Sequence, residues 1–277
     1  METRKPAEVR PNQPSDLSRR FSLGVRLLSG AFRFSGRVTW GSLLRDVPPG
    51  IRVVSVDLFN TLLLREPGAG REIALKWAGT FIRLLGKDSG STLTEQECLD
   101  LRRGTAKALR RQAITDGLDP EFRHEELVSS LAERLAGRPL EPEAAASASA
   151  TELDLERSAL GLNPEILAFA QANQQRGLRI IAISDMYFSG SQLHGLLSSL
   201  GVSCVSHVYS SCDLLLTKTT GRLFSHVLKV EGLEPRELLH VGDSLTADVL
   251  SPRAMGIRAA YYTPRRTARS RVRSGIA

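Results

Sequence analysis

The stretch Ile51-Arg-Val-Val-Ser-Val-Asp57 is a short β-branched run that ends in an acidic residue, which is typical of a buried strand. Four later segments have a similar character: residues 179–184, 204–210, 238–242 and 258–262. Helical patterns lie between them, over residues 164–176, 191–200, 222–231 and 247–255. Strands that alternate with helices in this way predict an α/β fold, with a doubly wound parallel sheet and helices on both faces.

The first two predicted strands are about 120 residues apart, which is too long for one crossover or for a structureless loop. Four segments in this gap have helix-forming composition, namely residues 72–85, 94–113, 121–136 and 151–160. Residues 140–150 are of low complexity and predict a flexible link or a frayed helix start. We therefore expect an inserted helical domain. The predicted boundaries are 1–50 for a basic N-terminal segment, 51–65 with 162–263 for the core, 66–161 for the insertion, and 264–277 for a basic tail.

Composition excludes several classes of protein. With 42% hydrophobic and 24% charged residues among 277, the chain has enough apolar material for a sizeable core, unlike a disordered chain. No apolar run approaches the roughly 18 residues that span a bilayer. Cys98, Cys204 and Cys212 have no CxxC spacing, so reduced thiols in a cytoplasmic protein are expected.

The net charge of +7 is concentrated at the two ends of the chain. Residues 1–56 carry ten basic and four acidic residues, and residues 264–277 carry five arginines and no acid. The remainder is mildly acidic, which argues against a specific nucleic-acid partner for the folded part. The basic ends are either solvated or in contact with an anionic surface.

Residues 17–33 have a basic amphipathic helix pattern. The apolar stripe comprises Leu17, Phe21, Val25, Leu28 and Phe32, and Arg19, Arg26 and Arg33 lie opposite. A helix docked on the core, a frayed end, and weak contact with an anionic membrane surface are all compatible with this pattern. Gly24 and Gly30 weaken any such helix by about 1 kcal/mol each. The expected location is thus cytoplasmic, with peripheral membrane contact as the alternative.

Chemically suitable residues gather where the predicted strands end. Asp57, Ser184 and Asp243 stand at three strand ends, and Lys218 stands in the loop after the third strand. Ligands of open parallel sheets bind at this edge. Carboxylates suit Mg²⁺ together with phosphate oxygens, and a lysine and a hydroxyl suit the remaining phosphate oxygens. Each residue alone is more typical of a cap, a turn or a surface lysine, but the four together favour phosphoryl transfer with Asp57 as nucleophile.

Four motifs then resemble those of the haloacid dehalogenase (HAD) superfamily, in the order of that family. They are VSVDLFNTL at residues 54–62, ISDMY at 183–187, TKTTGRLF at 217–224 and VGDSLTAD at 241–248. The resemblance covers residues 51–263 and implies a Rossmann-like core with a helical type-1 cap. The strings "ISDMY" and "HVGDSLTADV" look most like a branch of predicted hydrolases associated with glycosyltransferases.

The resemblance also implies a role for each matching position. The catalytic residues are Asp57 and Lys218. The Mg²⁺ ligands are Asp57, the backbone carbonyl of Phe59, and Asp243, with Asp248 as the second acid of the metal motif. The phosphate-binding residues are Thr61, Ser184, Asp185 and Lys218. The implied cofactor is Mg²⁺, and the implied activity is hydrolysis of a small phosphorylated metabolite, for which a sugar phosphate is a candidate.

Phe59 departs from the phosphatase pattern, because the residue two after the nucleophile is normally an aspartate general acid/base. A phenyl ring has no proton to give, and the amide of Asn60 does not titrate near neutral pH. The loss typically costs about 10²–10⁴ in rate. One alternative is therefore a catalytically weak or silent HAD-like binding or assembly protein. Dehalogenases of the family also carry an aromatic residue here, but the paired Asp243 and Asp248 favour phosphate chemistry.

The remaining polar residues give weaker signals. The five histidines are scattered without ligand spacing, so satisfied or solvated side chains are expected. A helix face in the insertion carries Arg102, Arg103, Arg110 and Arg111, and is interpreted as a solvated charged face or, alternatively, as a contact for an anionic substrate. The sequence predicts neither the substrate nor the oligomeric state.

Overall fold

The computed structural model describes residues 47–86 and 93–263. The predicted amphipathic segment 17–33 and the basic tail 264–277 lie outside these residues. Within the described ranges, no helix is both long enough and apolar enough to cross a membrane.

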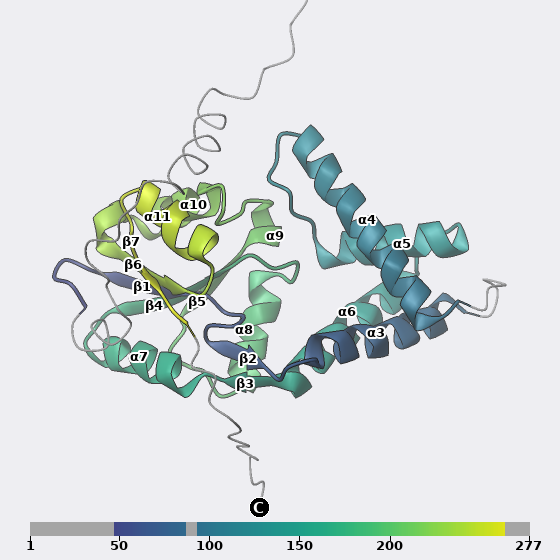
Figure 1. Ribbon diagram of the computed structural model, residues 1–277, viewed down its shortest axis with the longest axis horizontal. Coiled ribbons are helices and arrows are strands. Elements are labelled where there is room, and N and C mark those ends of the chain that lie inside the picture. Colours follow the sequence, from purple (N-terminus) through teal and green to yellow (C-terminus); the bar gives the residue numbers. More distant parts are fainter. Residues whose placement is uncertain (1–46, 87–92, 264–277) are drawn as a thin grey trace, which may run out of the picture. The chain divides into compact units, whose positions relative to one another are not determined.

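A five-stranded parallel sheet forms the centre of the core (Figure 1). Its strands are β1 (Val53–Val56), β4 (Arg179–Ser184), β5 (His207–Ser210), β6 (Leu238–Gly242) and β7 (Arg258–Tyr261), in the order β5-β4-β1-β6-β7. All four neighbouring pairs are parallel. The predicted α/β class and parallel sheet are therefore confirmed, and the carboxyl ends of all five strands share one edge.

Side-chain alternation along β1 explains why both faces of the sheet are covered. Val54 and Val56 are buried against α7 (Pro164–Gln175) and α8 (Gly190–Ser199) on one face. Val53 points to the other face, where α10 (Arg222–Glu231) contributes Phe224 and its neighbours. Figure 1 shows α7 and α10 on opposite sides of the strands. Helices on both faces make the sheet doubly wound, as predicted.

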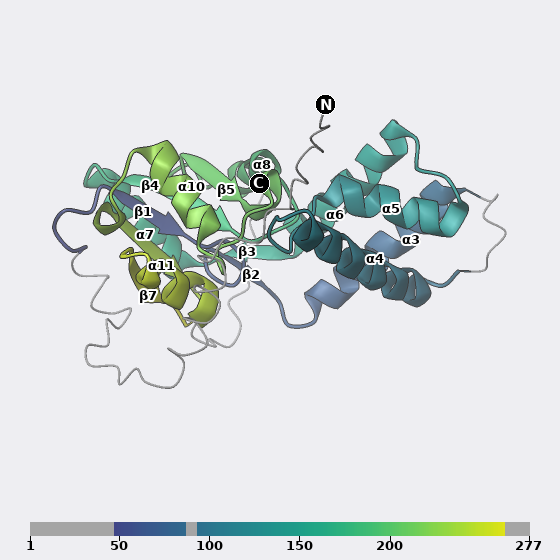
Figure 2. The same ribbon diagram turned by 90° about the horizontal axis from the view of Figure 1, so that it is seen from above.

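Four helices form the inserted cap: α3 (Ala69–Leu85), α4 (Glu95–Thr115), α5 (His124–Ala136) and α6 (Pro142–Ala159). They have a hydrophobic core of their own, in which Trp77, Phe81 and Leu131 are fully buried. At the base of the cap, β2 (Leu63–Arg65) pairs antiparallel with β3 (Leu160–Leu162) (Figure 2). This two-stranded sheet was not predicted, because three-residue strands are too short for a periodic pattern.

The structure decides between the two alternatives for residues 140–150 and differs from the prediction in one other segment. Residues 142–150 are the first turns of α6, as the helix-start alternative expected, and not a flexible link. Pro142 at the first helical position and the alanines favour a helix, and Ala148 is buried, with its carbonyl accepting a 3.0 Å hydrogen bond from Trp77 Nε1. The predicted helix 247–255 is instead a π-helical turn, Leu245–Leu250, followed by α11 (Ser251–Ala254).

Candidate active site

Lys218 lies between two carboxylates at the carboxyl edge of the sheet. Its Nζ donates to Asp57 Oδ1 and to Asp248 Oδ1, each at 2.6 Å. Asp57 directly follows β1, Lys218 precedes α10, and Asp248 stands in the π-helical turn after β6. The exposed fractions are 6% for Asp57, 3% for Lys218 and 0% for Asp248, so this contact is shielded from water.

Asp243 adds a third carboxylate to this cluster. Asp57, Asp243 and Asp248 each offer an oxygen, and these oxygens all lie within 4.8 Å of one another. Thr61 Oγ1 is 3.3 Å from Asp57 Oδ2 and 3.5 Å from Asp243 Oδ1. Three carboxylates around one ammonium leave an excess of negative charge, and an oxygen-rich anionic cluster is the donor set that Mg²⁺ prefers. The residues present therefore fit a divalent cation beside Asp57 and Asp243.

Ser184 and Asp185 follow one another at the end of β4. Ser184 is 2% exposed, and within the described residues no protein group is hydrogen-bonded to its hydroxyl. The Asp185 carboxylate, unlike the Ser184 hydroxyl, has a protein partner: its Oδ1 accepts a 2.9 Å hydrogen bond from the backbone N–H of Lys218. Burial raises the pKa of Asp185 to about 6, against the opposing pull of Lys218. Asp185 thus fixes the loop that carries Lys218, which is a contact the sequence did not predict.

His240 also contacts Asp248, at the same oxygen as Lys218, and was not predicted to do so. Its Nε2 is 3.1 Å from Asp248 Oδ1, and its Nδ1 is 2.8 Å from Ser55 Oγ. The backbone N–H of Ser244 donates to Asp248 Oδ2 at 2.8 Å. Asp248 therefore has hydrogen bonds on both oxygens, which suits a residue that orients Lys218. No sequence spacing links Ser55 and His240, because they are neighbours only across the β1–β6 ladder.

The electrostatics single out Asp57 among the carboxylates. Burial raises its pKa to about 7, because the attraction of Lys218 does not offset desolvation and two nearby acids. Burial also opposes ionisation of Asp248, but Lys218 and His240 outweigh it and hold the pKa of Asp248 below its usual value. For Lys218, burial lowers the pKa, but Asp57 and Asp248 raise it overall, so the ammonium stays charged. A cation beside Asp57 would relieve the cost of its negative charge.

Gly242, the last residue of β6, has no room for a side chain, because Asp248 packs against it. A Cβ at this position would lie 2.3 Å from Asp248 Cγ. We expect Gly242→Ala to lower the free energy of unfolding by about 1–3 kcal/mol, because Asp248 must shift. Gly195→Ala in α8 is the matched control, since its Cβ meets no atom within 4 Å and it should stabilise by about 0.5–1 kcal/mol. Urea denaturation measures both; equal effects would contradict the steric explanation.

The Phe59 ring is covered by a cation. The Arg65 guanidinium carbon lies 4.7 Å from the ring centroid, and Arg65 donates to both carboxylate oxygens of Glu156 at 2.8 and 2.7 Å. Glu156 belongs to α6, so this contact joins the loop after β1 to the cap. Asn60 takes a left-handed φ of 61°, a conformation in which asparagine is enriched. Phe59 and Asn60 thus have structural reasons to stand where they do.

Glu152 on α6 connects the cap to the loop after β4. Its carboxylate accepts hydrogen bonds from Tyr187 Oη at 2.8 Å and from Arg102 Nη2 at 2.8 and 2.9 Å. His124 Nε2 lies 2.6 Å away. The interpretation of Arg102 as part of a solvated face is therefore wrong, because its side chain is only 12% exposed and is paired with Glu152. The partner is 50 residues away in sequence, so helix periodicity carried no sign of it.

Glu152 is also predicted to make stability depend on pH. Burial opposes its ionisation, but His124 and Arg102 outweigh it and lower its pKa from 4.5 to about 2. The stability this gives is present above about pH 4.5 and is lost as the pH falls toward 2. Glu152→Gln should cost about 3 kcal/mol at neutral pH, and the deficit should shrink as the pH falls from 4.5 toward about 2. Denaturation at several pH values checks this, and a deficit independent of pH would contradict it.

The site thus combines clustered acids and a buried lysine at the edge of a parallel sheet, with a helical cap inserted in the chain. A family model of haloacid dehalogenase-like hydrolases matches residues 51–256, and the chain belongs to this family. No curated protein matches the chain. Its assignment to the glycosyltransferase-associated branch stays a prediction.

Two solved structures share the fold. One is the 2-haloacid dehalogenase from Pseudomonas syringae pv. Tomato DC3000, with a TM-score of 0.54, 20% identity, and coverage of 80% of this chain and 91% of that one. The other is a HAD phosphatase from Thermococcus onnurineus, with a TM-score of 0.51, 18% identity, and coverage of 80% and 90%. The predicted Rossmann-like core with an inserted cap is thereby confirmed.

Proposed function

We propose that this HAD-like hydrolase is a Mg²⁺-dependent phosphatase that acts on a small phosphorylated metabolite, with a sugar phosphate as one candidate. The observation that carries the proposal is the pairing of Lys218 with both Asp57 and Asp248, beside the third carboxylate of Asp243. Dehalogenation needs a nucleophilic carboxylate but no metal cluster, whereas a phosphoryl group needs its negative charge neutralised.

The proposed reaction begins with attack of an Asp57 carboxylate oxygen on phosphorus. The bond from phosphorus to the ester oxygen breaks, and its electron pair leaves with the alcohol, which takes a proton from solvent. Water then attacks the aspartyl-phosphate, so that inorganic phosphate leaves and the Asp57 carboxylate returns. Asp57, Asp243 and the Phe59 carbonyl would hold Mg²⁺, which would supply charge neutralisation at the phosphoryl oxygens.

The other residues of the site hold and orient these groups. Lys218 would contact phosphoryl oxygens while it keeps its pairs with Asp57 and Asp248. Ser184 would donate its hydroxyl to the phosphoryl group, which is consistent with a hydroxyl on a buried residue that has no protein partner within the described residues. Asp185 would hold the Lys218 loop, and Thr61 would donate to the nucleophile or to a phosphoryl oxygen.

Phe59 supports a second candidate function, namely a catalytically weak or silent binding or assembly protein. The ring occupies the acid/base position and lies under Arg65, so no titratable group is supplied from residue 59.

If the chain is a phosphatase, Phe59 also affects which substrates suit it. Good leaving groups need no general acid, and we therefore expect aryl phosphates to be the best synthetic substrates.

The decisive assay offers the full chain 4-nitrophenyl phosphate with Mg²⁺, the same ester with EDTA, and 2-chloropropionate. We expect nitrophenol release that falls to the background rate with EDTA, and no chloride release. Chloride release without metal would replace the proposal with a dehalogenase, and inactivity on both compounds would favour the binding protein.

The location and partners also remain proposals. We propose a cytoplasmic protein without a specific nucleic-acid partner, and the alternative is a protein whose residues 17–33 also contact anionic bilayers weakly. Co-sedimentation of the full chain with phosphatidylserine vesicles tests this, with an Arg19, Arg26 and Arg33 to Gln variant as control. Equal recovery of the two proteins with the vesicles would exclude the contact.

A further inference from the structure

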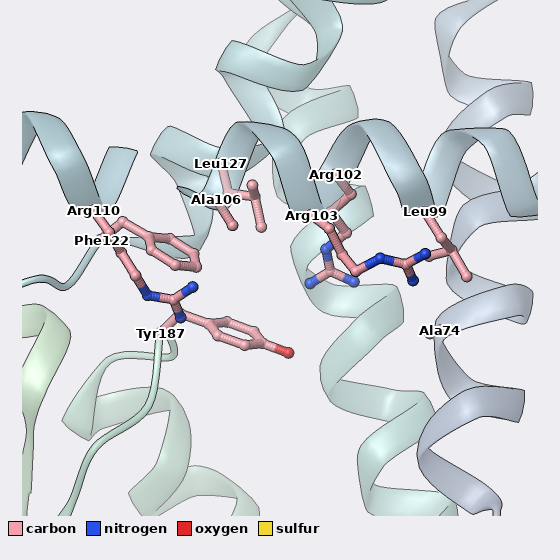
Figure 3. A pocket seen from close by; sticks show the side chains of 9 residues that line it. All are labelled: Ala74, Leu99, Arg102, Arg103, Ala106, Arg110, Phe122, Leu127 and Tyr187. Carbon is pink, nitrogen blue, oxygen red and sulfur yellow. The ribbon is translucent and has the colours of Figure 1, made fainter. Parts of the chain in front are cut away.

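A cavity of about 230 Å³ lies between the cap and the loop after β4 (Figure 3). Three arginines of α4 line it, namely Arg102, Arg103 and Arg110, together with the aromatic rings of Phe122 and Tyr187. Its remaining lining is apolar. The volume is below the roughly 300–1,000 Å³ of pockets that hold whole ligands, so it suits one end of a molecule.

The three arginines differ in how far their charge is already balanced. Arg102 is buried and paired with Glu152. Arg103 pairs with Asp100, but both side chains are more than half exposed, so that this pair is weak. Arg110 has no carboxylate partner among the described residues. Its guanidinium carbon lies 4.7 Å from the centroid of the Phe122 ring.

The Arg110 guanidinium packs on a stacked pair of aromatic rings, which orients it for an anion. The rings of Phe122 and Tyr187 are stacked, with centroids 5.8 Å apart and planes 9° from parallel. Phe122 is only 2% exposed, so it forms a fixed platform for the guanidinium. A guanidinium that lies on a ring keeps its N–H groups free, and these match the two oxygens of a carboxylate or phosphate.

The pocket is attached to the same sheet edge as the candidate active site. Tyr187 is three residues after Ser184, which limits their Cα atoms to about 11 Å apart. The residue before Phe122 is Glu121, which accepts a 2.5 Å hydrogen bond from Ser211 Oγ directly after β5. Short stretches of chain thus join the pocket to the edge that carries Ser184, and the length of substrate that spans the two places is what the test below measures.

We propose that this pocket binds a second anionic group of the substrate, so that the enzyme selects phosphate esters whose other end carries a carboxylate or a second phosphate. The proposal rests on the proposed phosphatase function. It assigns Arg110 as the residue that determines this specificity, with Phe122 as its positioning residue.

The test compares three series of compounds with matched chain lengths: alkyl phosphates, ω-carboxyalkyl phosphates and α,ω-alkane bisphosphates. Hydrolysis by the wild-type chain gives kcat/KM for each compound. Calorimetric binding to the Asp57→Asn variant in the presence of Mg²⁺ gives affinities without chemistry. At the best length, we expect a series with a second anionic group to exceed the alkyl phosphate by at least about tenfold in both measurements. The better of these two series identifies the second group.

Arg110→Gln should reduce this ratio to about one, whereas Arg111→Gln should keep it. Arg111 is on the same helix, is exposed like Arg110 and loses the same charge, but it does not line the cavity. Hydrolysis of alkyl phosphates without preference for either series that carries a second anionic group would overturn the pocket and leave the phosphatase intact. Binding that depends on Arg110 without any hydrolysis would overturn the phosphatase and leave the pocket intact. If the ratio fell equally in both variants, the preference would come from the overall positive charge of α4, and the assignment of Arg110 would be overturned.

Discussion

An Asp57→Asn variant is expected to lose at least about 10⁴-fold in kcat for aryl phosphate hydrolysis. Asparagine keeps the shape of the side chain and an oxygen that can accept from Lys218, but an amide oxygen is a poor nucleophile toward phosphorus. The loss should therefore appear in kcat. Steady-state kinetics with 4-nitrophenyl phosphate at saturating Mg²⁺ measures it.

The same variant should not be less stable than the wild-type protein in the absence of metal. Burial raises the pKa of Asp57 to about 7, so at roughly pH 8 the wild-type carboxylate is ionised at a net cost to the folded state. A neutral asparagine does not carry that cost. We expect an equal or higher free energy of unfolding, which separates lost chemistry from lost structure.

Asp185→Asn is the matched control for this prediction. Asp185 is a mostly buried acid at the same sheet edge, and it accepts from the backbone N–H of Lys218. Asparagine preserves that acceptor, so kcat should fall by no more than about tenfold. If both variants lost activity to the same extent, Asp57 would act as one of several charges around Lys218, and the aspartyl-phosphate would be excluded.

The parts of this site that the sequence predicted are those attached to strand ends. Asp57, Ser184 and Asp243 stand at the ends of strands whose composition is distinctive, and a parallel sheet brings such ends to one edge. Lys218 was predicted from its place in the loop after the third predicted strand, and the motif resemblance supported it, because a lysine in a loop has no pattern of its own. The core sheet was predictable for the same reason, since β-branched runs and helix-length gaps alternate along the chain.

The unpredicted parts are contacts between polar residues on separate elements. Glu152 accepts hydrogen bonds from Tyr187 of the core and from Arg102 of α4. No helix or strand periodicity in the sequence relates these positions. His240 was expected to be satisfied or solvated, and the structure gives it two partners, Ser55 and Asp248. Such pairs form because a buried polar group needs a hydrogen bond, and which group supplies it depends on the packing of the elements.

A Phe59→Asp variant is expected to hydrolyse esters with poor leaving groups about 10²–10⁴-fold faster than the wild-type chain. Residue 59 is two positions after the nucleophile, where a carboxylic acid can protonate the departing oxygen and later activate water. The gain should be small for 4-nitrophenyl phosphate, whose leaving group needs little protonation, and large for alkyl phosphates. Comparing kcat/KM for the two esters measures the difference.

The gain in rate from Phe59→Asp depends on whether Arg65 pairs with the new carboxylate. Its guanidinium lies over the Phe59 ring, and a carboxylate at position 59 would attract it. Both carboxylate oxygens of Glu156 already accept hydrogen bonds from Arg65, which holds the cation on the side of the cap. A shorter side chain at position 59 therefore leaves Arg65 where it is, and the new carboxylate stays available to the leaving group.

Phe59→Asn is the control that isolates proton transfer. It removes the same ring, and the same contact with Arg65, but its amide cannot donate a proton near neutral pH. Both variants should lose similar stability, so their difference in rate reports the carboxylic acid alone. Equal rates on alkyl phosphates would place residue 59 out of reach of the leaving oxygen. If neither variant nor the wild-type chain hydrolysed any ester, the acidic cluster would serve binding, and the chain would be the silent member of its family that Phe59 suggests.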